Sequence, residues 1–113
     1  MRYMEGRTDG QAVKASPDRF VAMLAMAEKG ACLLIDVRKP EEYRAERIEG
    51  ARNVPVDSLR TDLGELDRDT PLLVYCKVGK RRVKAVDQLH EMGFHQITVL
   101  DGGIEALKTF HKR

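Results

Sequence analysis

The sequence has few cysteines, and their spacing excludes several classes of site. Only two of the 113 residues are cysteines, Cys32 and Cys76. They form no Cys-x-x-Cys pair, and no cluster of histidine and cysteine has the spacing of a zinc site. We therefore expect no disulfide framework, no metal and no cofactor. For an exported chain, a Cys32–Cys76 bridge stays open at this point.

Long apolar runs are also missing. No stretch approaches the length of a membrane-spanning helix. Residues 1–10 are polar and mixed in charge, without the apolar core of a secretory signal. We expect a cytoplasmic protein with reduced thiols and no membrane partner. The formal net charge of +2 gives no argument for a nucleic-acid partner.

The length and composition suit one soluble domain with a single core. The chain is 42% hydrophobic and 34% charged, and it contains no internal repeats or low-complexity segments. We expect residues 1–12 to be a flexible lead-in and residues 13–113 to be the folded domain.

Short apolar runs alternate with segments of helical spacing. The apolar runs predict strands at 32–35, 50–56, 72–75 and 96–100. Helices are predicted after Ser16, from Pro40, after Asp57, over 82–92 and over 104–110. In the helix over 82–92, the residues expected to face the core are Val83, Val86, Leu89 and Met92. This alternation predicts an α/β fold with a parallel sheet covered by helices on both faces.

Cys76 ends a strongly apolar strand and precedes a helix. In open α/β sheets, ligands bind beyond the carboxyl ends of the strands. A loop that turns into a helix aims successive N–H groups at one point, and Gly79 supplies the backbone freedom for such a turn. These dipoles favour a thiolate, so we predict a lowered pKa for Cys76. Cys32 begins its strand, and we interpret it as a core residue.

The residues after Cys76 are strongly basic. Five cations and no acid fall within eight residues, namely Lys77, Lys80, Arg81, Arg82 and Lys84. Cations oppose the dipole at a helix start, and a local rule broken in this way often marks a functional site. We interpret Lys77, Lys80 and Arg81 as anion-binding residues and Lys84 as part of a solvated face.

Five segments together resemble the single-domain rhodaneses. In order, these segments are Asp36–Tyr43, Ile48–Pro55, Val74–Arg81, Gly93–Phe94 and Leu100–Ile104. The resemblance extends from about Ser16 to Phe110. The chain departs from the family pattern at Arg82, where Ser or Ala is common, at Arg47, where His is common, and at Leu107, where Trp is common.

The resemblance implies a rhodanese-like three-layer fold, with a five-stranded parallel sheet flanked by helices, and sulfurtransferase chemistry. Cys76 would take a sulfane sulfur from a small anionic donor such as thiosulfate, hold it as a persulfide, and pass it to cyanide or a protein thiol. The active-site loop would comprise Lys77, Val78, Gly79, Lys80, Arg81 and Arg82. Its amides would stabilise the persulfide, and its basic side chains would attract the donor.

Three further residues are expected to support the site. Asp36 and Arg38 end the neighbouring strand, and we interpret them as an ion pair or a cap that fixes the strand-to-helix turn, rather than as residues that orient the loop or contact the substrate. Arg47 is expected at the rim. The three histidines, His90, His95 and His111, are interpreted as surface residues.

Two other functions stay open. Cys76 and Arg82 also satisfy Cys-x5-Arg, the spacing of phosphatases and arsenate reductases of the same fold, whereas a rhodanese loop would end at Arg81. Tyr75 and Val83 stand where such phosphatases commonly have His and Ser or Thr. The third reading is a sulfur-relay or binding module without turnover of its own. The sequence leaves open the donor, the acceptor and the oligomeric state.

Overall fold

The structure is a computed structural model that describes residues 7–8, 12–77 and 82–111, with side chains over 12–77 and 83–109. Its elements are β1 (Arg7–Thr8), β2 (Ala12–Ala15), α1 (Pro17–Glu28), β3 (Leu33–Asp36), α2 (Pro40–Ala45), β4 (Arg52–Asn53), the 3-10 turn η1 (Val56–Ser58), α3 (Leu59–Asp62), β5 (Leu72–Tyr75), α4 (Arg82–Glu91), β6 (Ile97–Leu100) and α5 (Gly103–His111).

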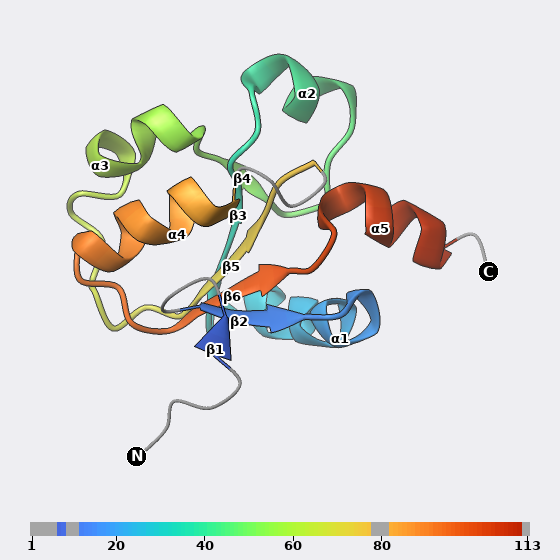
Figure 1. The fold of residues 1–113 in the computed structure, drawn as a ribbon, viewed down its shortest axis with the longest axis horizontal. Coiled ribbons are helices and arrows are strands. Elements are labelled where there is room, and N and C mark those ends of the chain that lie inside the picture. The colour runs from blue at the N-terminus through green and yellow to red at the C-terminus, as the bar shows by residue number, and fades with distance from the viewer. Residues whose placement is uncertain (1–6, 9–11, 78–81, 112–113) are drawn as a thin grey trace.

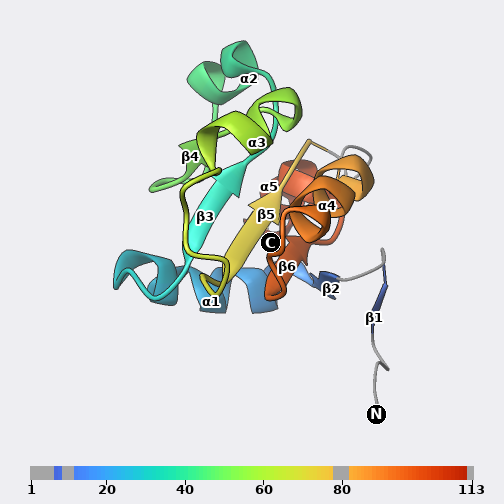
Figure 2. The same ribbon diagram turned by 90° about the vertical axis from the view of Figure 1, so that its left-hand side faces the viewer.

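A mixed sheet forms the centre of the molecule. The strand order is β1-β2-β6-β5-β3-β4, and all neighbours are parallel except β1, which pairs antiparallel with β2 at one edge. The five parallel strands confirm the predicted α/β architecture. β5 is the middle strand of these five, with β6 on one side and β3 on the other (Figure 2).

Helices cover both faces of the sheet. α1 and α5 pack on one face, whereas α3 and α4 pack on the other (Figure 1). Side chains alternate between the faces along a strand. Tyr75, the last residue of β5, therefore belongs to the core beneath α1 and α5. Its two neighbours in the sequence, Val74 and Cys76, belong to the core beneath α3 and α4.

The ends of α1 follow from local chemistry. Pro17 occupies the first turn, where its missing N–H costs no helical hydrogen bond. Ser16 stands at the predicted N-cap position, but its hydroxyl donates to the Asp18 carboxylate (2.6 Å) and caps no backbone N–H. Gly30 follows the helix with a φ of 81°, a left-handed conformation that favours glycine at this position.

The predicted core face of α4 was partly wrong. Val83 was expected to face the core, yet it is 47% exposed. The residues of α4 that are buried are Ala85, Val86 and Leu89. Successive residues of a helix are about 100° apart, so Val83 points away from the face that Ala85, Val86 and Leu89 turn toward the sheet.

The sequence analysis also missed two strands. β1 and the first residue of β2 lie within the segment expected as a lead-in. Ala12 pairs with Ile97 of β6 and is fully buried. β2 therefore forms part of the sheet, beside β6.

Candidate active site

Cys76 lies directly after the middle strand of the parallel sheet. The register pairs Asp36 of β3 with Tyr75 of β5, so the ends of these two strands meet at one edge. α4 begins six positions after Cys76, at Arg82. This strand–loop–helix arrangement is the one that the sequence predicted. Of the expected loop residues, Val78, Gly79, Lys80 and Arg81 lie outside the described part of the chain, as does the side chain of Arg82.

Hydrogen bonds from neighbouring segments hold three successive carbonyl groups at the base of this loop. The Val37 N–H donates to the carbonyl oxygen of Tyr75 (3.1 Å). The Ile104 N–H donates to the carbonyl oxygen of Cys76 (2.8 Å), and the Glu105 N–H donates to that of Lys77 (3.0 Å). Thus β3 holds the residue before the cysteine, and α5 holds the cysteine and the residue after it.

Gly103, at the start of α5, makes close backbone contact with the loop. A Cβ atom built there would lie 2.5 Å from the Lys77 carbonyl carbon and 2.6 Å from the Cys76 carbonyl oxygen. Gly103 also has a φ of 68°, which side chains disfavour. The sequence analysis placed Gly103 in the Leu100–Ile104 segment of the family resemblance, but the sequence does not show that this segment lies against the cysteine loop.

The thiol-bearing side chain of Cys76 faces the α3 and α4 side of the sheet. Cys76 is only 1% exposed and belongs to a core cluster with Val37, Val54, Ala85 and Val86. The ten-residue helix α4 follows the loop, and the positive end of its dipole faces back along the chain toward Cys76. An anion formed at this strand end therefore lies near a favourable helix terminus.

Two cations near the site can be described. Lys77 is exposed beside the buried cysteine. The Lys84 ammonium lies 3.5 Å from the Asp57 carboxylate, and its side chain is 69% exposed. Lys84 is therefore on a solvated face, as predicted, whereas Lys77 is the described cation next to Cys76.

The predicted Asp36–Arg38 ion pair is present and buried. The Asp36 carboxylate accepts from the Arg38 backbone N–H (2.8 Å) and from its guanidinium, with Nη2 at 2.8 Å. The Arg38 guanidinium also donates to the Glu46 carbonyl oxygen, and its central carbon lies 5.7 Å from the centre of the Tyr75 ring. These bonds fix the turn after β3, which itself binds the end of β5 through Val37.

Asn53 and Tyr75 also organise this edge, and the sequence analysis assigned neither of them a role. The Asn53 amide donates to the carbonyl oxygens of Asp36 (3.1 Å) and Arg38 (3.0 Å). The Tyr75 hydroxyl accepts from the Ile48 N–H (3.1 Å), and burial raises the pKa of Tyr75. An asparagine at a strand end is a visible signal, but only the pairing of β4 with β3 identifies its partners.

Arg47 and the histidines contribute less to this geometry. The Arg47 guanidinium donates to the Tyr43 carbonyl oxygen, and its central carbon lies 4.7 Å from the centre of the Tyr43 ring. Its expected place at the rim of the site stays a prediction. His90 and His95 are exposed, as predicted, and His95 lies 2.8 Å from the Asp69 carboxylate. The His111 side chain lies outside the described residues.

The two cysteines sit at opposite ends of the sheet. The pairing of Leu33 with Leu72 places Cys32 at the amino end of β3, whereas Cys76 follows the carboxyl end of β5. Strands rise about 3.3 Å per residue, so this offset exceeds the reach of a disulfide. Both cysteines are described, and neither is in a disulfide. Burial raises the pKa of the Cys32 thiol, consistent with a core residue.

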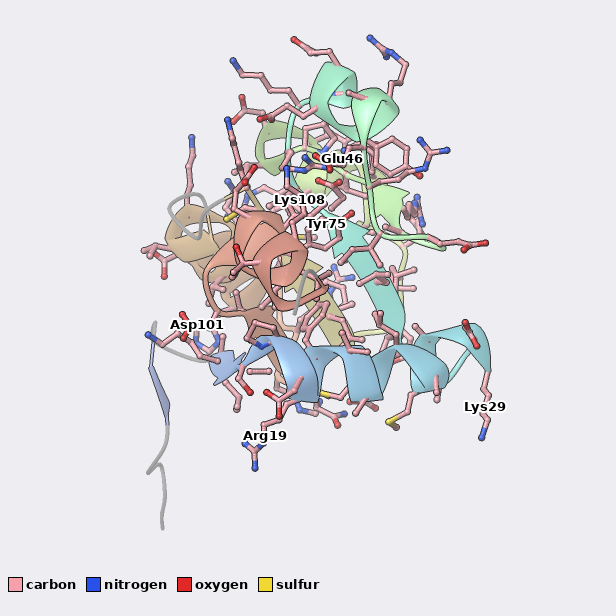
Figure 3. The ribbon with its side chains drawn as sticks, turned by 90° about the vertical axis from the view of Figure 1, so that its right-hand side faces the viewer. Arg19, Lys29, Glu46, Tyr75, Asp101 and Lys108 are labelled. Carbon is pink, nitrogen blue, oxygen red and sulfur yellow. The ribbon has the colours of Figure 1, made fainter. Side chains whose placement is uncertain are left out.

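An ion pair connects the residue that follows α2 to α5. The Lys108 ammonium of α5 binds the carboxylates of Glu46 (3.1 Å) and Glu105 (3.2 Å) (Figure 3). Glu46 directly follows α2, so this ion pair joins the α2 end to the helix that holds Cys76.

Within the described residues, no helix combines the length and apolar character needed to cross a bilayer.

Comparison with known proteins establishes the family. A model of the rhodanese-like domain matches residues 20–109, so the chain belongs to the rhodanese-like domain family. It is 32% identical over 84 residues to the thiosulfate sulfurtransferase GlpE of Shewanella oneidensis, which covers 74% of this chain and 83% of that protein. It is 38% identical over 72 residues to the Bacillus subtilis protein YqhL, which covers 64% of this chain.

Solved structures show the same fold. A rhodanese-like domain from an Anabaena protein matches with a TM-score of 0.76 and 26% identity, covering 86% of this chain and 74% of that one. Reduced CoADR-RHD of Bacillus anthracis matches with a TM-score of 0.72 and 32% identity over 89% of this chain. The present chain spans only 57% of YqhL and 17% of the Bacillus anthracis chain.

Proposed function

We propose that this protein is a sulfurtransferase that carries a sulfane sulfur on Cys76. The observation that carries the proposal is the placement of Cys76 at the end of the middle strand, with its own peptide group and its neighbours held by β3 and α5. A nucleophile held in this way needs little reorganisation when charge develops on it. Membership of the rhodanese-like family and the likeness to a thiosulfate sulfurtransferase support the same chemistry.

The first step forms the persulfide. The Cys76 thiolate attacks the outer sulfur of thiosulfate, the sulfur–sulfur bond of thiosulfate breaks, and sulfite leaves with the electron pair. The enzyme then carries Cys–S–S⁻, and the total charge is unchanged. The step needs a thiolate but no general base at the moment of attack, which suits a site whose described histidines, His90 and His95, are on the surface.

The second step returns the thiolate. A thiophilic acceptor, either cyanide or the thiolate of a partner protein, attacks the outer sulfur of the persulfide. The new bond is carbon–sulfur in thiocyanate or sulfur–sulfur in the partner, and Cys76 leaves as the thiolate. Lys77 is exposed next to Cys76 and supplies positive charge for an anionic donor or acceptor.

The test is the intact mass of the protein after incubation with thiosulfate. We expect wild-type protein to gain the mass of one sulfur atom, to lose it on treatment with cyanide, and to release one thiocyanate in exchange. Cys76→Ser should gain nothing, whereas Cys32→Ser, the matched control at the other cysteine, should gain sulfur like the wild type. Sulfur uptake by Cys76→Ser would contradict the proposed role of this residue.

The same experiment separates the other two functions. A protein that gains no sulfur but hydrolyses a phenyl phosphate in a Cys76-dependent manner would be a phosphatase, with the loop closed by Arg82. A protein that gains sulfur, but passes it on only to the thiol of a partner protein and not to cyanide, would be a relay. A protein that does none of these would be a binding module, and the proposed sulfurtransferase would be wrong.

A further inference from the structure

We infer that the first turn of α5 belongs to the active-site machinery and that Gly103 is a positioning residue for Cys76. The inference deepens the proposed function, on which its consequence for sulfur transfer rests. Its structural part concerns only described residues, namely the peptide groups of Cys76 and Lys77 and the start of α5.

The first observation is the closeness of two backbones. A Cβ on Gly103 would lie 2.5 Å from both the carbonyl carbon and the carbonyl oxygen of Lys77, and 2.6 Å from the Cys76 carbonyl oxygen. Atoms of a flexible side chain could move away from such a contact, but these are backbone atoms at the base of the loop. Any side chain at Gly103 must therefore displace either the loop or α5.

The second observation is the direction of the hydrogen bonds. The N–H groups of Ile104 and Glu105 bind the carbonyl oxygens of Cys76 and Lys77, at 2.8 and 3.0 Å. A trans peptide is planar, and its C=O and N–H point in opposite directions. Because the Cys76 carbonyl points toward α5, the N–H of Lys77 in the same peptide group points away from α5.

The thiol lies on that same side. The Cys76 side chain packs in the core beneath α3 and α4, whereas α5 covers the other face of the sheet. The clamp from α5 therefore directs the Lys77 N–H toward the face of the sheet that carries the thiol. An N–H fixed in this direction stabilises negative charge on sulfur, in the thiolate and then in the persulfide.

The chain offers matched variants to test this role. Gly103→Ala, Gly102→Ala and Gly30→Ala each place a side chain at a positive φ, of 68°, 81° and 81°. At Gly102 the new Cβ would lie 2.6 Å from the Cβ of Ala106, within α5 itself, and at Gly30 it would meet open space. The three variants share the backbone penalty. Gly103→Ala presses on the cysteine loop, Gly102→Ala presses on the first turn of α5 that holds this loop, and Gly30→Ala does neither, so Gly30→Ala is the matched control.

The measurement is the rate of alkylation of Cys76 by iodoacetamide as a function of pH, with peptide mapping to separate it from Cys32. The kcat and KM for thiosulfate and unfolding by urea are measured on the same proteins. We expect Gly103→Ala to shift the alkylation profile to higher pH and to lower kcat about 10- to 100-fold, the range for a small misplacement of a reacting group. Gly30→Ala, whose new Cβ meets open space, should be destabilised but keep the wild-type profile and kcat.

Two results would overturn the inference. One is a wild-type alkylation profile and kcat in Gly103→Ala; the other is an equal change in Gly30→Ala. If wild-type protein takes up no sulfur, the proposed function fails, but the alkylation profiles still test the clamp.

A second pair of variants serves if Gly103→Ala does not fold. Glu105→Pro removes the N–H that binds the Lys77 carbonyl, within the first turn of α5, where N–H groups make no hydrogen bond inside the helix. Glu105→Ala removes the same carboxylate, which binds Lys108, but keeps the N–H. We expect a shift of the alkylation profile in Glu105→Pro beyond that in Glu105→Ala, and equal profiles would contradict the clamp.

Discussion

At the scale of single residues, Asp36 and Arg38 form an ion pair with almost no contact with water. Their side chains are 0% and 4% exposed. Arg38→Met leaves the Asp36 carboxylate buried without its cation, and we expect the free energy of unfolding to fall by about 3–5 kcal/mol. The double variant Asp36→Leu/Arg38→Met removes both charges and should recover a large part of this loss. Urea unfolding of the two proteins measures the difference, and a double variant as unstable as the single one would argue against a charge effect.

Tyr75 makes stability depend on pH at the alkaline end. Burial raises the pKa of Tyr75 above its ordinary value of 10.0, so the folded protein holds this proton more tightly than the unfolded chain does. The resulting stabilisation is complete below pH 10, the ordinary value, and is lost as the pH rises through the raised pKa. We expect the free energy of unfolding, measured with urea, to decline above pH 10, the ordinary value, and to decline less in Tyr75→Phe. Parallel declines in both proteins would contradict this origin.

The sequence predicted Cys76 as the candidate nucleophile but not the residues that hold its backbone. Cys76 could be found because its signal is local: an apolar strand before it and a basic, glycine-containing loop after it. Gly103 and Asn53 act on this loop and on the neighbouring turn through contacts across the fold. A tight turn or a polar strand end can be identified from a sequence, but its partner depends on the order of the strands.

At the scale of elements, α4 has one face in the core and one in solvent, and the boundary can be tested. Leu89 is fully buried, whereas Val83 is 47% exposed. Leu89→Ala should lower the free energy of unfolding by about 2–5 kcal/mol because it leaves a cavity in the core. Val83→Ala should change it by no more than about 0.5 kcal/mol, the usual range for a surface substitution. Similar losses in both variants, measured with urea, would contradict the observed orientation of α4.

The elements that the sequence predicted best are those with the strongest apolar pattern. β5 has the predicted bounds, and β3 is shifted by one residue, because a strand buried on both faces reads as a continuous apolar run. β2 was missed because Ala12–Ala15 is a short strand that begins and ends with alanine and contains a lysine, so it carries little hydrophobic signal. Its place in the sheet comes from pairing with β6, which no local pattern encodes.

At the scale of the whole molecule, charge is nearly balanced, so any attraction of an anionic donor must be local. The chain has 20 Lys and Arg against 18 Asp and Glu. Lys77→Glu should raise the KM for thiosulfate, and the effect should shrink as salt shortens the Debye length from about 30 Å to about 8 Å. Lys29→Glu makes the same change in net charge at the exposed C-terminal end of α1. Figure 3 shows Lys29 well away from Tyr75, the residue before Cys76, so this variant should leave KM unchanged. Equal effects of the two variants on steady-state kinetics would point to global charge instead.

The contact between α5 and the cysteine loop sets an order of events during biosynthesis. The ribosome makes Cys76 well before it makes β6 and Gly103–Glu105, which complete the sheet beside β5 and bind the carbonyls of the loop. A nascent chain that ends before α5 therefore has the cysteine but not the peptide geometry around it. On the proposed function, Cys76 reaches its active geometry only when α5 docks, so a nascent chain without α5 would not yet take up sulfur.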